Sequence, residues 1–436
     1  MSPSAAIDRY LKRHAHAMSE AHDWPAPASD LSLVVVIPCL AESQSIGSVL
    51  DSLELGFARF EAVEVLLVVN QPEDAPAHVS EDNQATMAAL ASRTGSLHLH
   101  VLDRASPGMA LDPQQAGVGL ARRLGMDLAL RRLVAAGRSG QACIACLDAD
   151  SPVAPGYLDE LLRVFASEDQ PLAGVCAYRH PVDDPDPELA QAMVAYELWM
   201  RYFEQGLRLT ASPFSYPTIG SCIVCSAHGY ALADGMPPRQ AGEDFHFFQK
   251  LIKLASDERP VLRLRAQVHP SARPSWRVPL FGTGRALLRC LEEGPDAYRL
   301  VEPPEAFFEI QPFFAALKEG FVAPEILRAA AGPRLAAFME AERGWQRLES
   351  IRANQSSAER FARAAMHWFD GLRIVRYAHH LADELGRVPV MDALQRLAKQ
   401  AGGPLLSGLE SLPAPVGFPP ELSLQREMLE LLRSLD

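Results

Sequence analysis

The amino-acid sequence predicts an α/β fold with a mostly parallel open sheet flanked by helices, followed by an added all-α C-terminal region. Continuous apolar runs at residues 31–38 and 63–70 are typical of strands that are buried on both faces. Helical stretches alternate with such runs over short connections, which is the pattern of a parallel sheet. Near residue 300 the strand-like runs stop, and the remaining sequence has helical patterns only.

The elements follow in order along the chain. Residues 1–30 read as a short amphipathic helix and a breaker-rich link, "WPAPASD". Four strands and two helices then alternate, and the middle of the chain adds two more helices around an apolar stretch, "TIGSCIVCSAHGYALADG". We expect strands at 31–38, 63–70, 97–103 and 142–148, and helices at 43–60, 114–137, 187–209 and 242–256.

These elements predict three parts: an N-terminal arm (1–30), an α/β domain (31–300) and a helical C-terminal domain (301–436). In the last part, one apolar stripe predicts a helix face that packs on the core. The stripe repeats at alternating four- and three-residue steps and consists of Phe361, Ala365, Trp368, Leu372 and Val375.

Composition excludes several classes of function. The 436-residue chain has a formal net charge of −13, which argues against nucleic acid as the main partner. Its longest apolar run, residues 31–41, is far shorter than the roughly 20 residues of a membrane span. The N-terminus shows no signal peptide, and seven cysteines do not suggest a disulfide framework. We therefore expect a cytoplasmic protein, and peripheral attachment to the inner face of the membrane stays open.

Two candidate metal motifs stand in "ACIACLDADSPV". Cys143 and Cys146, like Cys222 and Cys225, have C-x-x-C spacing, but both pairs lie in apolar runs without a turn. In a strand, residues three apart point to opposite faces, so each pair would direct its sulfurs apart. Packing in the core is therefore the favoured interpretation over a zinc site.

The carboxylates Asp148 and Asp150 behave differently, because residues two apart in a strand share one face. They follow an apolar strand, and ligands of open α/β sheets bind outside the carboxyl ends of strands. Oxygen ligands select Mg²⁺ or Mn²⁺. The alternative interpretation, an Asp-rich turn that caps the next helix, stays open from these residues alone.

The motifs in their order resemble the family 2 glycosyltransferases of the GT-A fold, over roughly residues 31–290. The segment "VVVIPCLAESQSIGSVLDSL" is similar to the family's first strand and helix, with Pro38 and Glu42 in matching places. "AGVGLARRLGMDLAL", with Arg122, resembles the Gly-rich helix, and "CLDADSPVAPGYLDELLRVF" resembles the D-x-D segment. "GSCIVCSAHGYALADGMPPRQAGEDFHFFQKL" is similar to the acceptor-side segment with its Glu-Asp pair, Glu243 and Asp244.

The resemblance implies a metal-dependent transfer of a sugar from a nucleotide-sugar donor to a hydroxyl-bearing acceptor. It makes Asp244 the catalytic base beside Glu243, and Asp150 the principal ligand of Mg²⁺ or Mn²⁺. Asp148 would contact both donor and metal. His269 is a third candidate ligand, although a loop histidine is equally compatible with a structural role. The donor-binding candidates it implies are Pro38, Glu42, Asn70, Arg122 and Asp148.

Several features limit the resemblance. Asn70 stands where the family commonly has an Asp-Asp pair, so the nucleobase is open. The Q-x-x-R-W pattern of processive synthases is absent, which favours a single transfer over a polymerase. The inverting mechanism is what the resemblance implies through its Glu-Asp pair. Arg273, Arg277 and Arg285 suit a phosphate or an anionic acceptor, but equally a solvated basic loop.

Two other functions remain open from the sequence. One is a retaining transferase that acts on a small anionic acceptor, and the other is a non-catalytic scaffold that binds a nucleotide sugar. The helical C-terminal region has no counterpart in the family's shared core. Shaping an acceptor site, forming a homodimer and docking on a membrane are the roles open to it.

Overall fold

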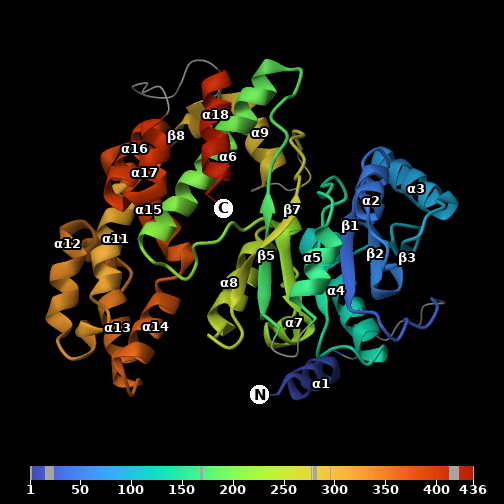
Figure 1. The fold of residues 1–436 in the computed structure, drawn as a ribbon, viewed down its shortest axis with the longest axis horizontal. Coiled ribbons are helices and arrows are strands. Elements are labelled where there is room, and N and C mark those ends of the chain that lie inside the picture. The colour runs from blue at the N-terminus through green and yellow to red at the C-terminus, as the bar shows by residue number, and fades with distance from the viewer. Residues whose placement is uncertain are drawn as a thin grey trace. The chain divides into compact units, whose positions relative to one another are not determined.

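The structure is a computed structural model that describes residues 2–14, 24–166, 170–275, 277, 282–294, 296–411 and 422–435. The chain divides into two compact units, one of residues 1–181 and 218–285 and the other of residues 182–217 and 286–436 (Figure 1). This division differs from the predicted limits at residues 30 and 300. The helix at 187–209 groups with the C-terminal helices because its apolar face packs among them.

The first unit is built on a seven-stranded sheet in the order β3-β2-β1-β4-β6-β5-β7. All neighbouring strands pair in parallel except at β6, which runs antiparallel to β4 and β5. The strands are β1 Leu33–Cys39, β2 Val63–Asn70, β3 His98–Arg104, β4 Cys143–Cys146, β5 Ala173–Tyr178, β6 Ile223–Ser226 and β7 Val261–Val268. The predicted mostly parallel open sheet is thus confirmed.

Helices connect these strands. They are α1 Pro3–Arg13, α2 Ile46–Glu54, α3 Ala77–Ser92, α4 Val118–Ala135, α5 Tyr157–Val164, α7 Ala227–Leu232 and α8 Glu243–Leu254. Strands β1 and β2 are almost wholly buried, as continuous Val and Leu runs predict for strands with both faces covered. The sequence analysis did not identify α3, whose buried face combines the apolar Val79 and Leu90 with the polar Asn83 and Thr86.

The four cysteines of the C-x-x-C pairs lie fully buried in or beside β4 and β6. Burial raises the pKa of the Cys143 and Cys225 thiols, which disfavours their thiolates. The predicted core-packing role of these residues is confirmed.

The second unit is helical, as predicted. Its helices are α6 Pro187–Leu209, α9 Thr283–Glu293, α10 Asp296–Arg299, α11 Glu305–Ala315, α12 Pro324–Ala341, α13 Gly344–Ala353, α14 Ala358–Trp368, α15 Gly371–Leu385, α16 Val390–Ala401, α17 Gly403–Glu410 and α18 Leu422–Arg433. The expectation that strands stop near residue 300 was wrong in one detail. Strands β8 Leu300–Val301 and β9 Val388–Pro389 form a two-residue antiparallel pair, too short for sequence periodicity to reveal.

The predicted stripe from Phe361 to Val375 spans two helices instead of one. Phe361 and Ala365 are buried, but Leu372 is 44% exposed. The reason is Asp370, whose carboxylate accepts a hydrogen bond from the backbone N–H of Arg373 and begins α15 there. The new helix has its own orientation, so the period does not continue across the break.

None of the helices in the described ranges combines the length and apolarity that crossing a lipid bilayer requires.

The close packing of α4 on the sheet depends on Gly125. A Cβ atom at this position would lie 2.4 Å from Val36 Cγ1 and 3.0 Å from Val68 Cγ2. We therefore expect Gly125→Ala to destabilise the fold by about 1–3 kcal/mol through overpacking. Gly47, also in a helix but with no neighbouring atom within 4 Å of where a Cβ would lie, is the matched control. Gly47→Ala should be neutral or slightly stabilising in the same thermal unfolding measurement.

Candidate functional site

The predicted acidic residues gather at the carboxyl edge of the parallel strands. Strands β1 and β4 pair in parallel and in register, with Val36 opposite Cys146, so both point their carboxyl ends to one edge. Glu42 follows β1 there, while Asp148 and Asp150 follow β4. The position that the sequence predicted for these side chains agrees with the structure.

Arg122, in the first turns of α4, connects two of the motifs. Its Nη2 donates to Asp148 Oδ1 and its Nη1 donates to Glu243 Oε1. The arginine is only 4% exposed, and a Cβ at Gly220 would lie 2.4 Å from Nη2. A glycine at that point therefore leaves the space that the guanidinium occupies. The D-x-D segment and the Glu-Asp pair, distant in sequence, meet through one side chain.

The Glu-Asp pair forms the start of α8. Gly242 precedes it in a left-handed conformation (φ +69°), and the helix begins at Glu243. Glu243 is buried, whereas Asp244 is partly exposed and its Oδ1 accepts a hydrogen bond from the N–H of Phe245 at 2.7 Å. Burial raises the pKa of both carboxyls and Arg122 lowers it, with a net rise. Of the two acids, only Asp244 is thus reachable from solvent.

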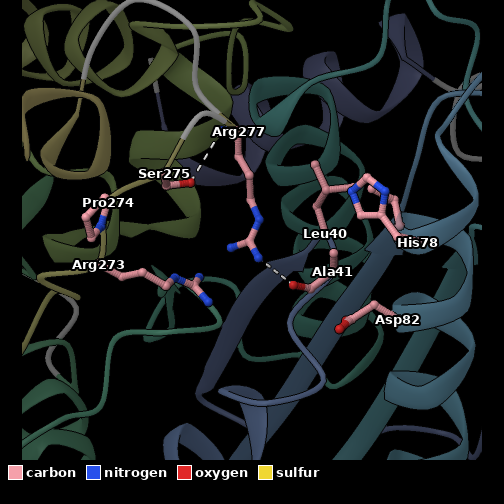
Figure 2. Close-up of a pocket in the computed structure, with 9 residues that line it drawn as sticks. Leu40, Ala41, His78, Asp82, Arg273, Pro274, Ser275 and Arg277 are labelled. Carbon is pink, nitrogen blue, oxygen red and sulfur yellow. Dashed lines mark hydrogen bonds between the residues drawn. The ribbon is translucent and has the colours of Figure 1, made fainter. Parts of the chain in front are cut away.

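Two arginines cover the other carboxylates. Arg273 Nη2 lies 3.0 Å from both carboxylate oxygens of Glu42 and 3.0 Å from Asp150 Oδ2. Arg277 donates through Nη1 to Glu42 Oε1 and through Nη2 to the carbonyl of Ala41 at 2.6 Å. Figure 2 shows both side chains extending from the 273–277 segment towards Ala41.

Opposing influences act on the pKa values of these acids. Burial raises the pKa of Asp150, and the charge of Asp148 raises it further, while Arg273 and Arg277 lower it. Burial also raises the pKa of Glu42, and Asp150 adds to that rise. The carboxylates therefore repel one another at this edge, and the two arginines offset that repulsion only in part.

A cavity of about 270 Å³ lies beside this cluster (Figure 2). It is lined by Leu40, Ala41, His78, Val79, Asp82, Arg273, Pro274, Ser275 and Arg277. Its wall combines apolar side chains with two guanidinium groups, a composition suited to a ligand with a flat apolar part and an anionic part.

Helix α3 contributes residues that the sequence analysis missed. Asp82 accepts hydrogen bonds from Ser43 N at 2.9 Å and Ser43 Oγ at 2.7 Å, and Asn83 Oδ1 accepts from Ala41 N at 2.9 Å. Ala41 has φ +53°, a left-handed conformation unusual for alanine. These bonds hold the loop after β1 in place. The signal available in the sequence was the polar run "SEDNQ", which carries no apolar period.

Two of the predicted donor-binding residues, Asn70 and Pro38, are not among those that line the cavity. Asn70 is 5% exposed, and its Nδ2 donates to the carbonyls of Cys39 and Val68 at 3.0 and 3.1 Å. This bonding braces the ends of β1 and β2. Pro38 is the second-last residue of β1 and is half-buried. Neither lines the cavity, and their donor-binding roles stay predictions.

The predicted metal ligands can be compared with the donor groups that a divalent cation requires. Asp148 and Asp150 present carboxylate oxygens, the donor type that Mg²⁺ and Mn²⁺ prefer. His269 instead has its Nδ1 3.2 Å from the carbonyl of Arg179. Within the described ranges, no three His, Cys, Asp or Glu residues are grouped to hold a metal ion. The residues fit a cation that two carboxylates share with substrate oxygens, and not a complete protein cage.

Comparison with known proteins gave distant structural similarity only. No protein-family model and no curated protein sequence matches the chain. A structure titled S. aureus TarS 1–349 in complex with UDP is 13% identical and superposes with a TM-score of 0.39, covering 78% of this chain and 91% of that one.

The same S. aureus protein in complex with UDP-GlcNAc is 14% identical, with a TM-score of 0.38 and coverage of 82% and 93%. The mannosyltransferase PcManGT from Pyrobaculum calidifontis, in complex with GDP-Man and Mn²⁺, is 14% identical. Its TM-score is 0.36, with coverage of 99% and 94%. At these values the similarities assign neither a family nor a ligand to the chain.

The raised pKa of Asp150 gives a prediction on stability. The raised pKa means that the folded state binds the proton of Asp150 more tightly than the unfolded state does. The protonated carboxyl therefore stabilises the fold, and this contribution is lost as the pH rises through the folded pKa. Asp150→Asn removes this loss, so we expect a higher melting temperature than wild type at pH 7. The difference should shrink as the pH falls through the raised folded pKa of Asp150, because the wild-type carboxyl then takes up its proton. Thermal unfolding from pH 4 to 8 measures this, and a variant less stable at pH 7 would contradict it.

Proposed function

We propose that this protein transfers a sugar from a nucleoside diphosphate donor to a hydroxyl group of an acceptor, in a single, inverting step. The observation that carries this proposal is the Arg122 bridge between Asp148 and Glu243 at the carboxyl edge of the sheet. It brings the D-x-D carboxylates and the Glu-Asp pair into one site. A transfer reaction needs both: carboxylates that would hold a cation against the leaving diphosphate, and a carboxylate for the attacking hydroxyl.

The cavity beside Ala41 is the proposed place of the nucleoside. Its apolar wall at Leu40, Val79 and Pro274 can contact a base, and Asp82 lies on the same wall. The guanidinium groups of Arg273 and Arg277 would face the diphosphate, because planar N–H forks pair well with phosphate oxygens. Which base the cavity prefers is a matter for direct binding measurement.

Asp148 and Asp150 are the residues that would hold Mg²⁺ or Mn²⁺, with His269 as the remaining candidate. When bound, such a cation supplies Lewis-acid stabilisation of the charge that develops on the leaving diphosphate. Arg122 keeps Asp148 in position through its Nη2. The same guanidinium holds Glu243, so the start of α8 is fixed relative to the donor-binding edge.

Asp244 is the proposed catalytic base. As the acceptor oxygen attacks the anomeric carbon, Asp244 takes the hydroxyl proton, and the bond from the anomeric carbon to the phosphate oxygen breaks. The electrons of that bond leave with the diphosphate. Burial raises the pKa of Asp244, which brings its basicity closer to the working pH. Attack opposite to the leaving group inverts the anomeric configuration.

The role of Asp244 can be tested by Asp244→Asn. We expect kcat to fall about 10²–10⁴-fold because the general base is lost. Donor binding should be retained, as measured by thermal shift with a panel of UDP- and GDP-sugars in the presence of Mn²⁺. Asp257→Asn, at an exposed position in the loop after α8, is the matched control. Unchanged turnover in Asp244→Asn would remove this residue from the mechanism.

The stereochemical outcome gives an independent test. With the donor that the thermal-shift panel identifies, NMR of the product should show the anomeric configuration opposite to that of the donor. Retention of configuration would instead favour the retaining transferase, and binding of donors without turnover on any acceptor would favour a scaffold.

A further inference from the structure

Arg273 occupies a position that is central to the acidic cluster. A single nitrogen, Nη2, lies 3.0 Å from Glu42 Oε1, Glu42 Oε2 and Asp150 Oδ2. The contact joins carboxylates from the ends of β1 and β4. Its side chain is 37% exposed, so water reaches the guanidinium. Arg277 also pairs with Glu42, and therefore Glu42 keeps a cationic partner without Arg273.

The same Asp150 is the residue through which the proposed function requires a divalent cation. A guanidinium at contact distance from a carboxylate neutralises part of its charge and repels a divalent cation that approaches the same group. Asp148 is also paired, because its Oδ1 accepts a hydrogen bond from the buried Arg122. The contact of Arg273 with Asp150 therefore opposes cation binding.

We propose that Arg273 is an internal competitor of the divalent cation at Asp150, and that a donor diphosphate relieves this competition by pairing with Arg273. This inference rests on the proposed function for the identity of the anion, but the competition itself concerns only Arg273, Asp150 and the cation. Its consequence is that cation and diphosphate bind cooperatively. The chain alone binds the cation weakly, and the anion frees Asp150 to receive it.

The cooperative binding of cation and diphosphate follows from the charges of the side chains at this edge. Without a ligand, the carboxylates of Glu42 and Asp150 are partly neutralised by Arg273 and Arg277. A diphosphate brings negative oxygens that these guanidinium groups pair with through two N–H donors at once. By linkage, whatever the diphosphate adds to cation affinity, the cation adds equally to diphosphate affinity.

The test is a titration of the full-length chain with Mn²⁺ in the absence of nucleotide, with free Mn²⁺ measured by electron paramagnetic resonance. We expect Arg273→Gln to bind Mn²⁺ about tenfold more tightly than wild type. Arg277→Gln removes the same charge nearby but no contact with Asp150, and should increase affinity less. Arg265→Gln removes an exposed charge on β7 and should leave affinity unchanged. Circular dichroism confirms that each variant is folded.

A second measurement uses UDP and GDP as probes. Either nucleotide that binds should raise Mn²⁺ affinity more in wild type than in Arg273→Gln, because the variant has no competitor to displace. If Arg273→Gln binds Mn²⁺ no more tightly than wild type or Arg277→Gln, the inference is overturned. That outcome leaves the proposed transfer reaction intact, whereas full activity of Asp244→Asn would overturn the reaction mechanism and leave the Mn²⁺ result standing.

Discussion

The buried guanidinium of Arg122 is the interaction on which the arrangement of the site depends. It lies among Asp148, Glu243 and Asp244, and these acids raise its pKa despite the burial that lowers it. A buried ion pair adds little net stability, but removing one partner leaves an uncompensated charge that costs about 3–5 kcal/mol. The bridge is therefore best understood as fixing geometry: the D-x-D segment and the start of α8 are held at one distance.

Backbone features provide the space that this side chain requires. Gly220 leaves room for the guanidinium, and Gly125, further along α4, lets the helix lie directly on β1 and β2. Side chains at these positions would move Arg122 away from the carboxyl edge of the sheet. The position of the guanidinium thus depends on the packing of α4 as well as on its own hydrogen bonds.

The sequence predicted those features that local pattern determines. The apolar runs of β1 and β2 identified buried strands. The two-residue spacing of Asp148 and Asp150 predicted one face of an extended strand, but β4 ends at Cys146 and Asp150 lies in a turn. The bonds of Arg273 with Glu42 could not be predicted in this way, because the partners are separated by most of the first unit. Helix α3 was missed because its buried face is half polar: Asn83 and Thr86 lie between the buried Val79 and Leu90 and interrupt the apolar period.

Charge balance connects these observations. At the carboxyl edge, acids outnumber the arginines that contact them, so burial and mutual repulsion raise the pKa of Glu42, Asp150 and Asp244. A core selected for stability alone would carry fewer such acids, since a neutral side chain avoids the desolvation cost. The residual negative potential has a use only if positive charge arrives with a ligand. In the proposed function, a cation would provide that charge and an accompanying diphosphate would give the arginines new partners, so that the two charges together would satisfy an edge that neither satisfies alone.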